Sequence, residues 1–209
     1  MEAKVEANVE QQWSRSRIVD LDKEKRLPRF KFSDLERGKF LGKGGFCTVD
    51  GIQRFKVKGA AAGGGGKKKK GAGDEVVEFE SREFILEHSK RSNGDARYAI
   101  KYLSPDVLQD QHRAMQGLAD FAAETHFLTA IDHPNIVKLR AVAEGTPFHK
   151  SYFLVLDRLY DILDVKIPKW NKQSKKISIG GKKKRALLEE RLVAAADLSD
   201  ALSFLHGHR

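Results

Sequence analysis

Short apolar runs, separated by glycine and polar stretches, occupy the middle of the chain. Two such runs, between Leu35 and Phe55, flank a cluster of glycines, an arrangement typical of a β-hairpin. Three further runs, at residues 97–103, 136–142 and 152–156, are rich in β-branched and aromatic residues and indicate three more strands. The pattern therefore predicts five strands.

Helical periodicity dominates residues 106–131, where Phe121, Leu128 and Ile131 recur on one stripe. Glu124 lies between Phe121 and Leu128 on that stripe, so a helix would turn its carboxylate toward the apolar face. A carboxylate turned toward a core is costly unless a cation pairs with it. The sequence thus predicts one inward-facing helix and a basic partner for Glu124.

A second amphipathic helix is predicted over residues 187–206, and a shorter one after Leu159 that Pro168 is expected to limit. The apolar stripe of the longer helix comprises Leu188, Leu192, Ala195, Leu198, Leu202 and Leu205. Little of the sequence is left to cover this stripe, so we expect the natural polypeptide to continue beyond Arg209. Five strands together with these helices indicate the α+β class.

The 209 residues are enough for one to two domains, and shifts in composition suggest their limits. Residues 1–33 are charged and sparsely apolar, which predicts a flexible leader or a short helix. A Gly/Lys-rich segment at about 57–75 is expected to be a low-complexity insert inside a longer insertion over 57–97. A basic insert is expected at about 169–186, between the two later helices.

Two basic runs, Lys67–Lys70 and Lys182–Arg185, contribute to a net charge of +10. Such a balance raises nucleic acid or an anionic membrane surface as a partner. Both runs follow glycines in a low-complexity context, however, and lack interleaved aromatic side chains that could stack on bases. We therefore expect solvated inserts, with a localisation signal or a phosphate-binding patch as the alternative.

Composition and hydropathy exclude several classes of site and location. Cys47 is the only cysteine, so the chain has no internal disulfide, and no Cys/His cluster at ligand spacing indicates a metal site. Charges recur through the first twenty residues, where a secretory signal would be apolar. No apolar run approaches the about 20 residues that cross a bilayer. The sequence thus predicts an intracellular protein, cytoplasmic or nuclear, without a membrane span.

The motifs that carry chemistry lie in the predicted hairpin and in the strand after the insertion. Gly42-Lys43-Gly44-Gly45-Phe46-Cys47-Thr48-Val49 resembles the glycine-rich loop of eukaryotic protein kinases, with Cys47 where the third glycine would stand. Tyr98-Ala99-Ile100-Lys101 resembles the V-A-I-K strand, and Glu124 follows on the next helix. The resemblance implies a five-stranded antiparallel small lobe over 34–159 with one inward-facing helix, followed by the first helices of the large lobe over 160–209.

This resemblance also implies an ATP site. The glycines would let main-chain N–H groups approach the phosphates, Lys101 would supply a positive charge, and Glu124 would keep that lysine charged and aimed. An apolar roof would cover the adenine ring, and main-chain groups of the segment between the lobes would bind its edge. The implied cofactor-binding residues are Leu41, Gly42, Lys43, Gly44, Gly45, Phe46, Val49, Ala99, Lys101, Asp157 and Leu159.

The implied activity is transfer of the ATP γ-phosphate to a serine or threonine hydroxyl of a protein substrate, with Mg²⁺ required. The sequence holds neither the aspartate of the catalytic loop nor a D-F-G motif, and no aspartate follows His208-Arg209. We therefore expect the chain to be inactive by itself and the metal ligands to lie in a large lobe beyond it.

Two other classes of function stay open. A catalytically inactive, kinase-like scaffold would use the small lobe to bind a regulatory partner. A basic nucleic-acid-binding protein would show binding that falls steeply with salt and does not depend on Lys101.

Overall fold

The computed structural model describes residues 21–56, 81–176 and 181–207. The chain forms two compact units, which are described separately. The first comprises Met1–Ile131 and Lys138–Arg158, and the second comprises Asp132–Val137 and Leu159–Arg209. Strands and helices both contribute to the first unit, and helices dominate the second, so the fold is α+β as expected.

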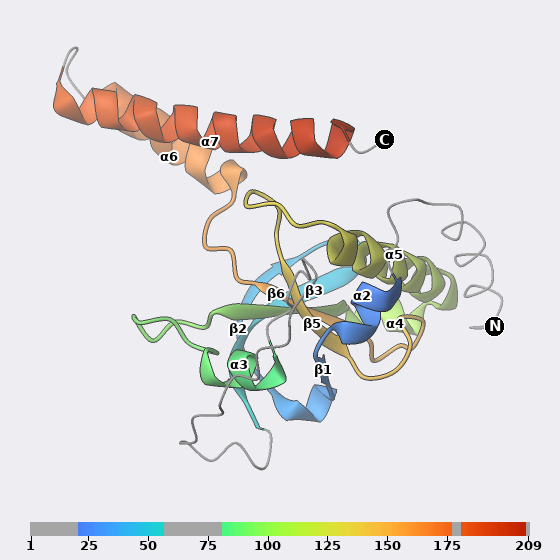
Figure 1. Ribbon diagram of the computed structural model, residues 1–209. Coiled ribbons are helices and arrows are strands. Elements are labelled where there is room, and N and C mark those ends of the chain that lie inside the picture. Colours follow the sequence, from blue (N-terminus) through green and yellow to red (C-terminus); the bar gives the residue numbers. More distant parts are fainter. Residues whose placement is uncertain (1–20, 57–80, 177–180, 208–209) are drawn as a thin grey trace, which may run out of the picture. The chain divides into compact units, whose positions relative to one another are not determined.

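A mixed sheet lies at the centre of the first unit (Figure 1). It has six strands in the order β1-β5-β6-β4-β3-β2. The strands are β1 (Arg29–Phe30), β2 (Leu35–Lys43), β3 (Cys47–Phe55), β4 (Tyr98–Leu103), β5 (Leu139–Ala143) and β6 (Phe153–Asp157). Neighbours from β2 to β5 pair antiparallel, whereas β1 and β5 pair parallel. The sequence predicted five strands. The sixth, β1, was missed because a strand of two residues is too short to show an alternation of apolar and polar side chains.

Helix α5 (Gln111–Ala130) contacts β4 and β5 and follows the short helix α4 (Pro105–Gln109). Asp110 caps α5 by accepting hydrogen bonds from the main-chain N–H groups of the first turn. The buried face includes Phe121 and Leu128, as the periodicity predicted, and also Leu118. Burial of this face fixes the side of α5 that meets the sheet.

The segment before β2 is part of the fold. Helix α2 (Leu21–Arg26) contacts α5, β1 follows it, and the 3₁₀ turn η1 (Phe32–Asp34) leads into β2. Leu27 and Phe30 are buried in the core. Residues 1–20 of the predicted leader lie outside the described residues, while the rest forms the short helix and an unpredicted strand.

The predicted insertion over 57–97 is described only from residue 81 onward, so the low-complexity insert at 57–75 lies outside the described residues. Its later part holds helix α3 (Arg82–Glu87), where Ser81 accepts a hydrogen bond from the N–H of Phe84 as N-cap. Ile85 of α3 is fully buried. This part of the insertion therefore packs into the first unit.

Helices α6 (Leu163–Lys176) and α7 (Lys182–Gly207) make up most of the second unit. Pro168 lies inside α6, where it was expected to end the helix. The buried side chain of Trp170 offsets the cost of this proline. Nζ of Lys166 and Cζ of Arg191 lie 5.8 and 5.9 Å from the centroid of its ring. Contacts with α7 thus outweigh the helix-breaking tendency of proline.

The basic insert predicted at 169–186 is largely helical over its described residues, most of which are exposed. Residues 169–176 belong to α6 and residues 182–186 to α7. Lysine and arginine have good helix propensity, so the charge run extends the helix. The predicted stripe of α7 is mostly exposed, with Leu188, Leu192, Leu198 and Leu202 each about half exposed, whereas Leu187 and Ala201 are buried.

Candidate nucleotide-binding site

An ion pair between β4 and α5 is the centre of the candidate site. Lys101 lies on β4, paired in register with Val49 of β3 and Leu154 of β6. Its Nζ lies 2.5 Å from Oε2 of Glu124, the residue that the periodicity of α5 turned inward. The structure thus supplies the basic partner that the sequence required for this carboxylate.

The pair is neither buried nor fully solvated. The side chains of Lys101 and Glu124 are 24% and 28% exposed. Nζ also lies 5.9 Å from the ring centroid of Phe121, which covers one side of the ammonium. Lys101 is therefore held in place by a carboxylate and an aromatic face, and solvent access leaves room for an additional anionic partner.

Gly42 lies near the end of β2, and Gly44 and Gly45 lie in the turn between β2 and β3; these three residues are here called the glycine turn. A Cβ atom at Gly42 or Gly45 would meet nothing within 4 Å, and one at Gly44 would meet only the carbonyl of Cys47 at 3.9 Å. None of the three has positive φ; among the described glycines only Gly94 and Gly145 do. Neither packing nor backbone conformation requires glycine at these three positions. Their contribution is that no side chain covers the main chain of the turn.

The glycine turn is tied to the helices by contacts that the sequence did not reveal. Lys43 Nζ lies 2.8 Å from the carboxylate of Asp106 on α4, and Arg113 of α5 donates to the carbonyl of Gly45 at 3.1 Å. Lys43, expected among the loop residues that bind phosphate, is thus paired across to α4. These contacts fix the turn over the N-terminal part of α5.

Gly117 allows the close approach of Phe46 to α5. A Cβ atom at Gly117 would lie 2.6 Å from Cδ2 of Leu103 and 3.3 Å from Cβ of Phe46. A glycine in the middle of a helix costs about 1 kcal/mol relative to alanine, so its presence there usually has a packing reason. This glycine inside a helical pattern was the sequence signal that could have located the contact.

The structure brings together only some of the residues expected to contact the adenine base of ATP. Val49 and Ala99 lie on neighbouring strands on the same face as Lys101, since Val49 opposes Lys101 and Ala99 precedes it by two residues. Ala99 is buried, and Leu41 on β2 is half-buried. Leu159 belongs to the second unit, where its side chain is 65% exposed. The first unit by itself therefore holds the phosphate end and part of the apolar roof.

Asp157 is engaged within the fold by both its side chain and its main chain. Its carboxylate accepts two hydrogen bonds from the guanidinium of Arg140, at 2.9 and 2.8 Å. Its N–H donates to the carbonyl of Lys138, and the N–H of Arg158 donates to the carbonyl of Arg97. A bound base would therefore have to use other main-chain groups of this segment.

Cys47 follows the glycine turn and is half-buried. Burial raises the pKa of its thiol to about 11, and the positive charge of Lys101 only partly opposes this. At about pH 8 the reactive thiolate should therefore be about a hundredfold scarcer than for an ordinary cysteine. We expect alkylation by iodoacetamide, followed by mass spectrometry, to be slower by that factor than in urea, and to accelerate as pH rises toward 11. Equal rates in both conditions would contradict the burial.

No family model matches this chain, and no curated protein matches it significantly. Over the described residues, no helix is both long and apolar enough to cross a membrane. The same part of the chain holds no group of three or more His, Cys, Asp or Glu side chains that could bind a metal ion.

Proposed function

We propose that this chain is the ATP-binding part of a protein kinase with serine/threonine specificity. The observation that carries the proposal is the Lys101–Glu124 ion pair. Lys101 lies on β4, which pairs with β3 next to the glycine turn, and the space at the Cβ positions of Gly42 and Gly45 is open. The antiparallel strands β2, β3, β4, β6 and β5, with α5 across them, support a kinase-like small lobe in this proposal.

The chemistry proposed for the site is recognition of a polyphosphate. The open Cβ positions of Gly42 and Gly45 let an anion approach the main chain of the turn. Lys101 would contribute a charge-assisted hydrogen bond to a phosphate oxygen while Glu124 keeps its ammonium in place. Val49 and Ala99 would contact the base through apolar surface.

Transfer of the γ-phosphate requires groups that this sequence does not hold. In kinases a catalytic-loop aspartate orients the substrate hydroxyl, and Mg²⁺ is held by the D-F-G aspartate and a catalytic-loop asparagine. We therefore assign phosphoryl transfer to a protein substrate only to a polypeptide that also contains the large lobe. For the chain itself, the proposed activity is binding of ATP with its Mg²⁺.

A second candidate, a kinase-like interaction module without catalysis, is favoured by one observation. Helix α7 exposes several leucines, among them Leu188, Leu192 and Leu198, and large exposed apolar surfaces commonly mark contacts with other proteins. Such a module would form a stable complex through α7 whether or not nucleotide is bound.

Titration of the purified 209-residue chain with Mg-ATP in an isothermal calorimeter tests the proposed function. We expect saturable one-site binding that ADP competes and that AMP, lacking the outer phosphates, competes more weakly. The absence of binding at about 1 mM ATP, the upper end of ordinary enzyme KM values, would contradict it. Parallel titration with duplex DNA addresses the basic inserts, because tight, salt-sensitive DNA binding without ATP binding would favour the nucleic-acid alternative.

A further inference from the structure

A close polar contact, largely shielded from solvent, joins the N-terminal segment to the helix that carries Glu124. Oε2 of Glu24 on α2 lies 2.6 Å from Nδ1 of His126 on α5, and the two side chains are only 11% and 12% exposed. The contact between the two side chains is therefore shielded from most of the solvent.

His126 and Glu124 lie on opposite sides of α5. They are two residues apart, which corresponds to about 200° around a helix. Glu124 meets Lys101 on the sheet side, while His126 meets Glu24 on the other side. Helix α5 thus makes one close polar contact on each side, and a rotation or slide of the helix that separates one contact also displaces the other.

The segment that carries Glu24 has its own attachments to the sheet. Residues 21–34, here called the N-terminal clasp, contain β1, which pairs parallel with β5 through Arg29 opposite Val142 and Phe30 opposite Ala143. The side chain of Phe30 is completely buried and lies against the ring of Phe55. These contacts fix the clasp to the edge of the sheet independently of α5.

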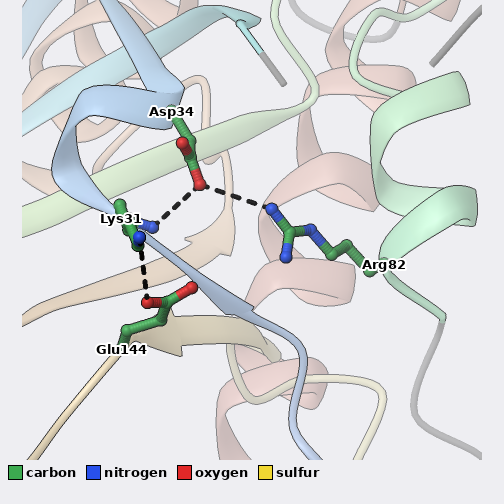
Figure 2. Close-up of polar contacts among 4 residues, drawn as sticks. All are labelled: Lys31, Asp34, Arg82 and Glu144. Atoms are coloured by element: carbon green, nitrogen blue, oxygen red, sulfur yellow. Dashed lines mark hydrogen bonds and ion pairs between the residues drawn. The ribbon is translucent and has the colours of Figure 1, made fainter. Parts of the chain in front are cut away.

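Polar contacts at the end of the clasp attach it to two further elements, as Figure 2 shows. Asp34 accepts a hydrogen bond from the main-chain N–H of Lys31 at 3.0 Å and one from Arg82 of α3 at 3.3 Å. Lys31 Nζ also lies 3.9 Å from the carboxylate of Glu144, directly after β5. The clasp therefore spans from the sheet edge and α3 to the outer side of α5.

We propose that the N-terminal clasp is a positioning element for the Lys101–Glu124 pair and acts through the Glu24–His126 contact. The inference rests on the proposed nucleotide site. Apolar side chains of similar volume often stabilise a fold as well, so stability alone does not account for two polar side chains there. The close approach of Glu24 to His126 instead ties the rotation and axial position of α5 to the clasp, and with them the position of Glu124.

The test is a mutant cycle on Mg-ATP affinity, measured by calorimetry at one pH and well below the melting temperature. Glu24→Gln and His126→Gln roughly keep the size of each side chain and remove the carboxylate–imidazole contact. We expect each to weaken Mg-ATP binding about fivefold or more in the natural background, the usual lower range of coupling between sites. In a Glu124→Gln background neither substitution should weaken binding of Mg-ATP further, because the carboxylate that the clasp is proposed to position is already absent.

Two further variants separate positioning from a general loss of structure. The combined exchange Glu24→His with His126→Glu recreates the pair in reverse and should restore affinity to within about twofold, whereas each half alone should not. It measures the same coupling if Glu24→Gln fails to fold. Glu36→Gln is the matched control, since it removes a paired carboxylate of β2, bound to Arg54 at 2.7 Å, and should leave ATP affinity unchanged.

The outcomes distinguish the two proposals. If the unmodified chain binds no ATP, the proposed function fails, and the clasp proposal falls with it. If the unmodified chain binds ATP and the clasp variants bind it equally well, only the clasp proposal fails. Equal losses in the natural and Glu124→Gln backgrounds would show that Glu24 and His126 support folding without acting on Glu124.

Discussion

Replacing Lys101 with methionine is expected to weaken binding of Mg-ATP about ten- to a hundredfold. Hydrogen bonds to charged groups contribute about 1.5–3 kcal/mol, and each 1.4 kcal/mol corresponds to a tenfold change in affinity. Methionine keeps a long unbranched side chain next to Phe121, so the loss should come from the missing ammonium. Calorimetric titration of the two chains side by side measures the ratio of their dissociation constants.

Two controls make the Lys101→Met result specific. Lys150→Met also removes one positive charge from the first unit, at an exposed position between β5 and β6, and should leave the affinity within about twofold. The melting curve of Lys150→Met should stay close to that of the unmodified chain. Lys101→Met leaves Glu124 without its cation, so its affinity is measured well below its own melting temperature. An affinity for ATP that is unaffected by Lys101→Met would remove the role assigned to this lysine.

The centre of the candidate site could be predicted because local pattern determines it. The spacing of Glu124 on an apolar helical stripe required a cation, and the interior lysine of an apolar strand was the candidate that the structure brings to it. The hairpin around the glycines was predicted for the same reason, since alternating runs and glycine punctuation are signals within one short window. The structure has both β2 and β3 within the range that the pattern predicted.

The N-terminal clasp could not be predicted in this way. Strand β1 has two residues, and its partner Val142 lies more than a hundred residues later in the chain, so neither periodicity nor propensity marks it. Glu24 and His126 are unremarkable as polar residues in charged surroundings. Only the packing of α2 on α5 makes them a buried pair.

The second unit shows how tertiary contacts override local signals. Pro168 is a strong helix breaker, but burial of Trp170 between α6 and α7 keeps α6 helical through it. The leucine stripe of α7 was correctly predicted to be helical, yet most of it is exposed. Periodicity identifies a helix face that is apolar, and it contains no information about what covers that face.

Replacing Phe121 with alanine should lower the free energy of unfolding of the first unit by about 3–5 kcal/mol, the usual cost of truncating a buried phenylalanine. Phe121 is 1% exposed on α5, and its ring lies edge-on to Tyr152 with the centroids 6.4 Å apart. The substitution removes apolar contacts and leaves a cavity next to Lys101. Urea unfolding followed by circular dichroism measures the loss.

Phe40→Ala is the matched control for this loss, because the chemical change is the same at a residue of β2 that is 57% exposed. The free energy of unfolding of that variant should change by no more than about 0.5 kcal/mol. Phe121→Ala should also weaken Mg-ATP binding under conditions where the variant is still folded, since the ring covers one side of the Lys101 ammonium. A loss of stability below about 1 kcal/mol at Phe121, or equal losses at both positions, would contradict the packing of α5 on the sheet. Lost stability with full ATP affinity would instead show that the core holds the fold without orienting Lys101.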